Sequence, residues 1–197
     1  MGLPGLFSKT ILSRSVELKP SLFIKSMHPK TQIRPDRASV AKVLALGWWG
    51  QKKVHGHRAQ IHLGPKAEEQ VLAYTRKGLL HTRPLPMGIV NELYRLFSPE
   101  DSWIAIDCEW VKPEEKLYLF DVLKWGGRTL SHLTYSERYE LLPKVFKSES
   151  IETLPIYKTL SSCMSVLEGS CERVEGLVFK APDTKGFFDT SIVRCRK

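Results

Sequence analysis

Hydrophobic and polar positions alternate in several segments of this chain, and the alternation predicts β-strands because successive side chains of a strand point to opposite faces. The pattern is continuous over residues 53–63 and is followed by a Gly-Pro turn at 64–65. Further strands are predicted at 70–75, 103–110, 117–122, 174–180 and 191–196. The polar segment 112–116 and the loop 182–186 each separate two of these strands.

Helical spacing of apolar residues predicts three helices. Asp36 is placed to cap the first, which Gly47 ends. The third opens with a capping box from Thr134 to Glu137, and Pro143 is expected to kink it or end it early. The apolar residues of the three helices are Val40, Val43 and Leu44; Val90, Leu93, Tyr94 and Phe97; and Tyr139, Leu142 and Phe146.

Strands and helices in mixed order predict an α+β fold with mainly antiparallel sheets flanked by helices. The length of 197 residues suits one sizeable domain. We expect that domain to occupy residues 36–197, after a basic N-terminal arm or lead-in segment at 1–35. Glu17 is the single acid among the first 34 residues, so the arm is suited to touch nucleic acid, although an organellar transit peptide has the same composition.

The chain carries 30 Lys and Arg against 21 Asp and Glu, which gives a formal charge of +9. Such a surface attracts polyanions, of which nucleic acid is the commonest, although a merely basic soluble protein has the same charge. No apolar run approaches the roughly 20 residues that span a bilayer, so we expect no membrane partner.

The four cysteines, Cys108, Cys163, Cys171 and Cys195, are scattered, with no CxxC spacing. They predict core residues in a reducing compartment rather than a zinc site or a disulfide framework. We therefore expect an intracellular, cytoplasmic protein, with a nucleoid or organelle location also compatible. His55, His57 and His62 would be an alternative zinc set, but no fourth ligand stands at a suitable spacing.

Lys53 is the candidate nucleophile. A lysine amine can attack the α-phosphate of a nucleoside triphosphate, provided that nearby cations or desolvation make it neutral. A lone lysine in a strand is normally a solvated surface residue, so the assignment depends on the segments around it.

Those segments occur in a fixed order. Residues 53–58 read KVHGHR, 75–78 read TRKG, 175–180 read EGLVFK and 192–197 end in RCRK, while Glu109 and Phe120 lie between them. In this combination the chain resembles the adenylation domain of ATP-dependent DNA ligases, over residues 44–196. The resemblance implies a ligase-type nucleotidyltransferase domain around an ATP cleft, and a lysyl-AMP intermediate.

The resemblance also implies a role for each matching residue. Lys53 would carry AMP, with Gln51 and Val54 beside it; Arg58 would contact the ribose, Arg76 would belong to the next motif, and Phe120 would stack on the purine. Glu175 and Glu109 would bind Mg²⁺, with Asp107 on the same strand face as Glu109. Lys180, Arg194 and Arg196 would contact phosphates, or Arg196 and Lys197 in a second register.

Three positions depart from the family pattern. His55 replaces the usual aspartate, which removes a carboxylate beside the nucleophile. Gln51 replaces a glutamate that accepts from the adenine amino group, although an amide oxygen can still accept. Arg194 and Arg196 replace two lysines, and a planar guanidinium is not equivalent to an ammonium.

We therefore predict an ATP-dependent DNA ligase domain that uses ATP and Mg²⁺, acts on nicked double-stranded DNA, and is a monomer. The rhythm of 120–138, from Phe-Asp to Glu-Arg, favours DNA over RNA ligation by resemblance. We expect no C-terminal OB-fold domain of the kind that follows the adenylation domain in these ligases, so joining by these residues alone should be weak without an OB-fold domain or partner protein. The alternatives are an RNA ligase, an mRNA capping guanylyltransferase, and a non-catalytic nucleic-acid-binding relative.

Overall fold

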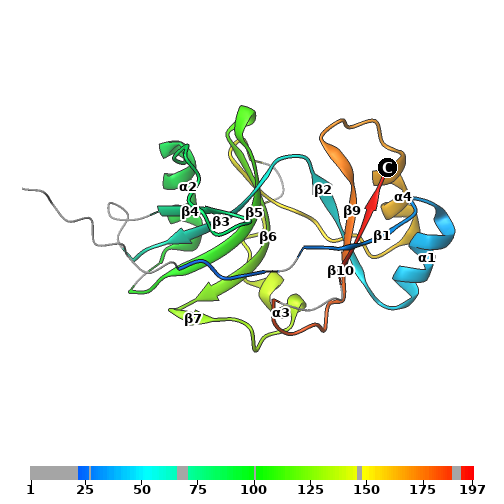
Figure 1. Ribbon diagram of the computed structural model, residues 1–197, viewed down its shortest axis with the longest axis horizontal. Coiled ribbons are helices and arrows are strands. Elements are labelled where there is room, and N and C mark those ends of the chain that lie inside the picture. Colours follow the sequence, from blue (N-terminus) through cyan, green and yellow to red (C-terminus); the bar gives the residue numbers. More distant parts are fainter. Residues whose placement is uncertain (1–21, 27, 66–70, 100, 146–147, 188–191) are drawn as a thin grey trace, which may run out of the picture.

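The computed structural model describes residues 22–26, 28–65, 71–99, 101–145, 148–187 and 192–197. Two sheets stand side by side, with two helices beside the smaller sheet and one at the outer side of the larger sheet (Figure 1). Among the described residues no helix is long and apolar enough to cross a membrane.

The smaller sheet has four strands in the order β1 (Thr31–Ile33), β10 (Ile192–Arg196), β9 (Val174–Lys180) and β2 (Trp49–Val54). β1 runs parallel to β10, and the other pairs are antiparallel. Helices α1 (Arg37–Ala45) and α4 (Leu160–Glu168) pack on this sheet through a core that includes Val40, Cys163 and Phe179.

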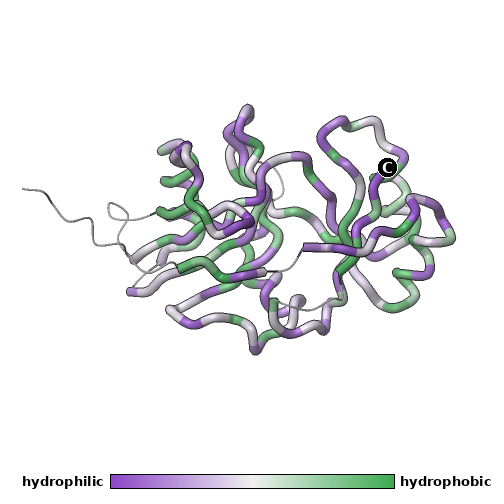
Figure 2. Tube along the Cα trace, in the orientation of Figure 1, coloured by the Kyte–Doolittle hydropathy of each residue, from purple (hydrophilic) through white to green (hydrophobic). Residues whose placement is uncertain are grey.

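The larger sheet has six strands. The order is β4 (Val71–Thr75), β3 (His57–Leu63), β5 (Ile104–Val111), β6 (Lys116–Trp125) and β7 (Arg128–Thr129), and β8 (Ile151–Thr153) pairs in parallel with β6. A 3-10 turn, η1 (Lys112–Glu114), joins β5 to β6. Helix α2 (Met87–Phe97) covers the sheet with Val90, Leu93 and Phe97, as its apolar spacing predicts, and also with Ile89. Hydrophobic segments accordingly alternate with polar ones along these elements (Figure 2).

Both predicted helix caps are present. Asp36 accepts from the backbone N–H of Ser39 at 2.7 Å and caps α1. Thr134 and Glu137 form the capping box of α3 (Tyr135–Glu140), which ends before Pro143. Phe146, which the pattern assigns to this helix, lies outside the described residues.

One predicted strand is wrong. Residues 53–63 do not form one strand, because the chain leaves the smaller sheet after Val54, turns at 55–56 and enters the larger sheet as β3. Alternation continues through the turn, so the pattern does not reveal the change of sheet. Helix α4 was not predicted, although the Thr159 side chain caps it by accepting from the backbone N–H of Ser162, and its buried Cys163, Met164 and Leu167 have helical spacing.

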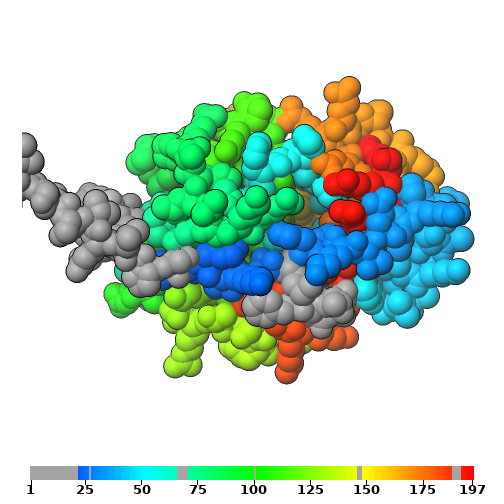
Figure 3. All heavy atoms as spheres, in the orientation of Figure 1, coloured from blue at the N-terminus to red at the C-terminus, as the bar shows by residue number. Residues whose placement is uncertain are grey.

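The described N-terminal residues, 22–26 and 28–33, contact both sheets. The backbone of Ile24 exchanges two hydrogen bonds with the side chain of Gln60 on β3, and β1 pairs with β10. In the space-filling view this segment (blue) runs across the face between the two halves of the molecule (Figure 3). It therefore forms part of the wall between the sheets.

Candidate active site

A cavity of about 700 Å³ lies where the two sheets meet. Apart from Lys197 of the second register, whose Nζ donates to the carbonyl of Gly169, every residue that the sequence assigns to the site lines the cavity, although the residues come from both sheets and from distant parts of the chain. They are Gln51, Lys53, Val54, Arg58, Arg76, Glu109, Phe120, Glu175, Lys180, Arg194 and Arg196. The sequence-derived set is thus brought together in one place.

Lys53 and Glu175 are paired at the end of strands β2 and β9. Lys53 lies opposite Gly176 in the register of the two strands, beside a bulge between Lys53 and Val54. This places Lys53 Nζ 2.5 Å from Glu175 Oε2, in a contact that is about three quarters buried. The candidate nucleophile is therefore held in a fixed position by a carboxylate.

His55 and Arg196 complete the surroundings of this carboxylate. His55 Nδ1 donates to Glu175 Oε1 at 2.6 Å, and Arg196 Nη2 lies 3.4 Å from Oε2. Partial burial by itself would raise the pKa of Glu175, but the hydrogen bonds from Lys53 and His55 lower it below its ordinary value. The histidine that departs from the family pattern thus contacts the acidic residue of the candidate site, a pairing that sequence reasoning missed.

Gly176 is required by strand packing. Its φ is +138°, and a Cβ built there would lie 2.0 Å from the carbonyl oxygen of Cys195 on β10. Any larger residue would push β9 and β10 apart. Close approach between two strands, rather than between backbone and ligand, explains this glycine.

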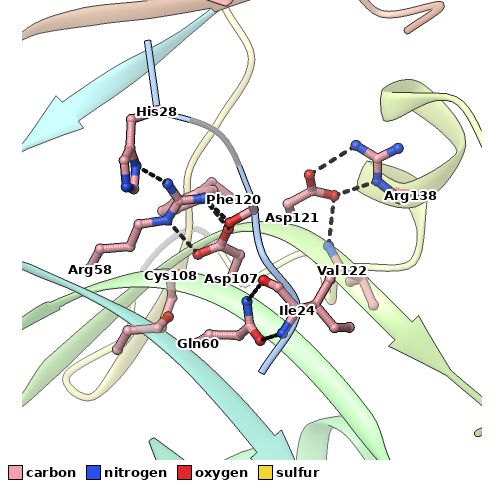
Figure 4. Close-up of polar contacts among 12 residues, drawn as sticks. Ile24, His28, Arg58, Gln60, Asp107, Cys108, Phe120, Asp121, Val122 and Arg138 are labelled. Atoms are coloured by element: carbon pink, nitrogen blue, oxygen red, sulfur yellow. Dashed lines mark hydrogen bonds and ion pairs between the residues drawn. The ribbon is translucent and has the colours of Figure 1, made fainter. Parts of the chain in front are cut away.

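Arg58 is anchored by Asp107 (Figure 4). Asp107 is 1% exposed, and its carboxylate accepts from Arg58 Nε at 2.9 Å and from Nη2 at 2.5 Å. Ser26 Oγ accepts from Arg58 Nη2 at 2.7 Å, and His28 Nδ1 lies 2.5 Å from Nη1. Asp107, which lines the cavity together with Glu109, thus holds Arg58 in place.

Glu109 lines the cavity and makes no ion pair with any other residue that the structure describes. Desolvation raises the pKa of Glu109 to about 7, although the cations of Lys53 and Arg58 oppose the shift. A carboxyl with this pKa can hold or release a proton near neutral pH.

The other end of the cavity is aromatic. Lys180 Nζ lies 4.8 Å from the centre of the Phe120 ring and 4.3 Å from that of Tyr135. Burial lowers the pKa of Lys180 to about 8, although Asp121 and Asp107 oppose the shift. Val178 and Lys180 line the cavity whereas Leu177 and Phe179 are fully buried, as the alternation along this strand predicts.

Both polar groups of the Gln51 side chain form hydrogen bonds within the protein. The side chain is 2% exposed; its Oε1 accepts from the Tyr135 hydroxyl at 2.6 Å, and its Nε2 donates to the carbonyl of Leu154 at 3.2 Å. Tyr135 is therefore a further polar group at this end, and sequence reasoning assigned it to helix capping alone. Nothing in its sequence position reveals that it reaches Gln51, which lies 84 residues away.

The remaining candidates take different positions. Val54 is 6% exposed and packs with Val111 and Leu154, so its side chain belongs to a small core in the cavity wall. Arg194 donates to Gln32 at 3.1 Å, and Arg76 is exposed at the rim.

Asp121 and Arg138 form a buried, bidentate ion pair. Arg138 Nε donates to Asp121 Oδ1 at 2.9 Å, and Nη2 donates to Oδ2 at 3.0 Å. Asp121 also accepts from the backbone N–H of Val122, and Arg138 lies over the Phe187 ring at 5.0 Å. The Phe-Asp and Glu-Arg pairs of residues 120–138, which by resemblance favour a DNA ligase, thus have a structural role, because Asp121 and Arg138 join β6 to α3.

The three histidines of the alternative zinc site do not meet. His62 is fully buried and bonds Gln60 at 2.8 Å, whereas the side chain of His55 is 76% exposed and bonds Glu175. Within the described ranges, no group of three or more His, Cys, Asp or Glu is arranged to hold a metal by itself.

A family model described as RNA ligase matches residues 47–196, which is most of the chain. No curated protein matches this chain in sequence.

Several solved structures share the fold. The mycobacterial DNA ligase D complexed with ATP and MES has a TM-score of 0.55 and 16% identity, over 76% of this chain and 55% of that one. The ligase domain from M. tuberculosis LigD has a TM-score of 0.54 and 16% identity, over 75% and 54%. Pmar-Lig_PreS3 has a TM-score of 0.53 and 15% identity, over 85% of this chain and 46% of that one.

The chain spans about half the length of these structures. At such identities the likeness concerns the fold alone. It confirms the predicted α+β fold with mainly antiparallel sheets, as in ligase nucleotidyltransferase domains.

Proposed function

Because this chain belongs to the RNA ligase family, we propose that its central cavity binds ATP and transfers AMP covalently to Lys53 in order to join polynucleotide ends. The observation that carries the proposal is the fixed contact between Lys53 Nζ and Glu175 Oε2 in the wall of a cavity whose other end is aromatic. A nucleotide matches this cavity, because its flat base suits the aromatic end and its phosphates suit the end that carries Lys53.

The aromatic end takes the base. Phe120 offers a ring for stacking, and the Tyr135 hydroxyl oxygen and Gln51 amide lie beside it. Arg58 lies 5.7 Å from the Phe120 ring and faces the ribose, which follows the base. The charged end, with Lys53, Arg194 and Arg196, takes the triphosphate.

The first step forms one bond and breaks another. Lys53 Nζ, as a neutral amine, attacks the α-phosphorus, a P–N bond forms, and the bond from that phosphorus to the bridging oxygen of pyrophosphate breaks. Glu175 orients the amine, and a carboxylate of the site accepts the proton that Nζ loses. Arg194 and Arg196 stabilise charge on the departing phosphates.

The carboxylates fit a magnesium ion. Mg²⁺ in proteins is commonly held by one or two carboxylates together with substrate phosphates, and Glu175 and Glu109 both line the cavity beside Lys53. We propose these two residues as its ligands. When bound, Mg²⁺ neutralises phosphate charge.

The polynucleotide is proposed to be RNA. The family match supports RNA over the DNA that the sequence resemblance favoured. In the later steps AMP passes from Lys53 to a 5′-phosphate, and a 3′-hydroxyl then attacks that phosphorus and releases AMP.

Intact-mass measurement after incubation with ATP and Mg²⁺ tests the first step. We expect the mass to rise by one AMP, with no rise in Lys53→Ala and an unchanged rise in the control Lys42→Ala, which alters an exposed residue of α1. GTP in parallel distinguishes a guanylyltransferase. No adduct with either nucleotide contradicts the proposal and supports a non-catalytic relative.

Nicked duplexes of RNA and of DNA, each with a 5′-phosphate, test the substrate. We expect AMP to pass from the adenylated protein to the RNA end. Transfer to DNA alone contradicts the RNA assignment.

A further inference from the structure

The described N-terminal residues, 22–26 and 28–33, contribute side chains to the cavity. Ser26, His28 and Pro29 line it, although none of them lies in a segment that the sequence assigns to the site. The segment is fixed on both sides, by Ile24 on Gln60 and by β1 on β10. Ser26 and His28 therefore form part of the cavity wall, where both contact Arg58.

The contact with Arg58 determines the tautomer of His28. A guanidinium can only donate, so His28 Nδ1, at 2.5 Å from Arg58 Nη1, must accept. The ring proton of neutral His28 then resides on Nε2. Within the described part of the chain, no hydrogen-bond partner is found for this nitrogen.

The ring is also kept neutral. Burial, with the cations of Arg58 and Arg76, lowers the pKa of His28 against the opposing effect of Asp107. The arrangement is thus a polar cluster in which Asp107 holds Arg58, Arg58 orients His28, and His28 retains one N–H donor (Figure 4).

We propose that His28 is a nucleotide-specificity residue whose Nε2–H donates to a ribose hydroxyl of the bound nucleoside triphosphate. The inference rests on the proposed function, which places the ribose between Phe120 and Lys53. A donor without a protein partner in a cavity wall selects for a ligand oxygen, because a ligand that lacks the oxygen leaves the donor without a hydrogen bond.

Equilibrium binding of ATP, 2′-deoxyATP and 3′-deoxyATP tests the assignment. Calorimetric titration in the Lys53→Ala background with Mg²⁺ measures affinity without the covalent step. We expect one of the two deoxy analogues to bind about 5-fold more weakly than ATP, the effect of one net hydrogen bond.

The variant His28→Asn isolates the donor. Its amide oxygen can still accept from Arg58, but the side chain does not reach the Nε2 position. We expect ATP binding to weaken about 5-fold, while the Kd of the discriminated analogue stays unchanged and the preference disappears. Thr31→Ala, which alters an exposed residue of β1 in the same segment, is the matched control and should keep the preference.

Two results would overturn the proposal. One is equal affinity for all three nucleotides in the Lys53→Ala background, which requires no change at His28. The other is an equal loss for ATP and the analogue in His28→Asn, which would show that the residue only supports the wall. If the unmodified protein forms no AMP adduct, the proposed function fails; if the adduct forms without ribose discrimination, only the role of His28 fails.

Discussion

Lys53 Nζ lies 2.5 Å from Glu175 Oε2, although 122 residues separate them in the chain. The contact joins β2 to β9 and fixes the amine at one point of the cavity wall. Since Glu175 also accepts from His55 and lies close to Arg196, one carboxylate organises three basic groups.

Replacing that carboxylate should therefore impair adduct formation more than folding. For Glu175→Gln we expect the rate of AMP adduct formation to fall by at least about 100-fold, because charge stabilisation and orientation of Lys53 are both lost. Intact-mass time courses measure the rate. Glu152→Gln is the matched control, since Glu152 pairs with Lys116 at 2.8 Å outside the cavity lining. An equal loss in both variants would contradict a specific role for Glu175.

A carboxylate at position 55 should make stability dependent on a divalent cation. In His55→Asp the new carboxylate faces Glu175, and the two repel each other in the absence of a cation. We expect the Tm in EDTA to fall by about 2–4 °C relative to the unmodified protein, as for a loss of roughly 1 kcal/mol. Millimolar Mg²⁺ should restore most of the difference, while the exposed control His57→Asp should respond less. A Tm of His55→Asp that is insensitive to Mg²⁺ would argue against cation binding at Glu175.

The buried pair of Asp121 and Arg138 should be important for stability. Removing one partner leaves an uncompensated charge, so Asp121→Leu or Arg138→Leu should each lower the free energy of unfolding by about 3–5 kcal/mol. The double variant should lose clearly less than the sum, which urea denaturation and a double-mutant cycle would show. Glu140→Ala, which breaks the exposed pair with Lys144, should cost less than about 1 kcal/mol. Additive losses at Asp121 and Arg138 would contradict the assigned coupling.

Lys180 should favour function at the expense of stability. Because desolvation lowers its pKa to about 8 in the folded protein, against an ordinary value of 10.5, its charge destabilises the fold near neutral pH. We expect Lys180→Met to raise the Tm without nucleotide and to weaken ATP binding.

The pH dependence has a defined sign. Between pH 8 and 10.5 the unfolded chain binds the proton that the folded protein has released, so the stability of the unmodified protein rises with pH in this window relative to Lys180→Met. The advantage of Lys180→Met is therefore complete below pH 8 and disappears as the pH approaches 10.5. Thermal unfolding across this range measures it; an advantage that grows with pH would contradict the burial of the charge.

The sequence by itself determined most of the secondary structure and named many of the residues that line the cavity. Alternation placed Val178 and Lys180 on the cavity side and Leu177 and Phe179 in the core, because side-chain direction in a strand has period two. The helix caps at Asp36 and Thr134 are hydrogen bonds between residues three positions apart in the chain, so they too could be predicted from local sequence.

Only the tertiary structure decided which sheet each strand joins and which polar groups meet. The division of 53–63 between two sheets, the contact of His55 with Glu175, and the placement of His28 on Arg58 all join segments without a shared local pattern. Periodicity reports the face on which a side chain lies but not the strand that will lie beside it. Partners 30 or 120 residues apart become neighbours only when the two sheets close on one cavity.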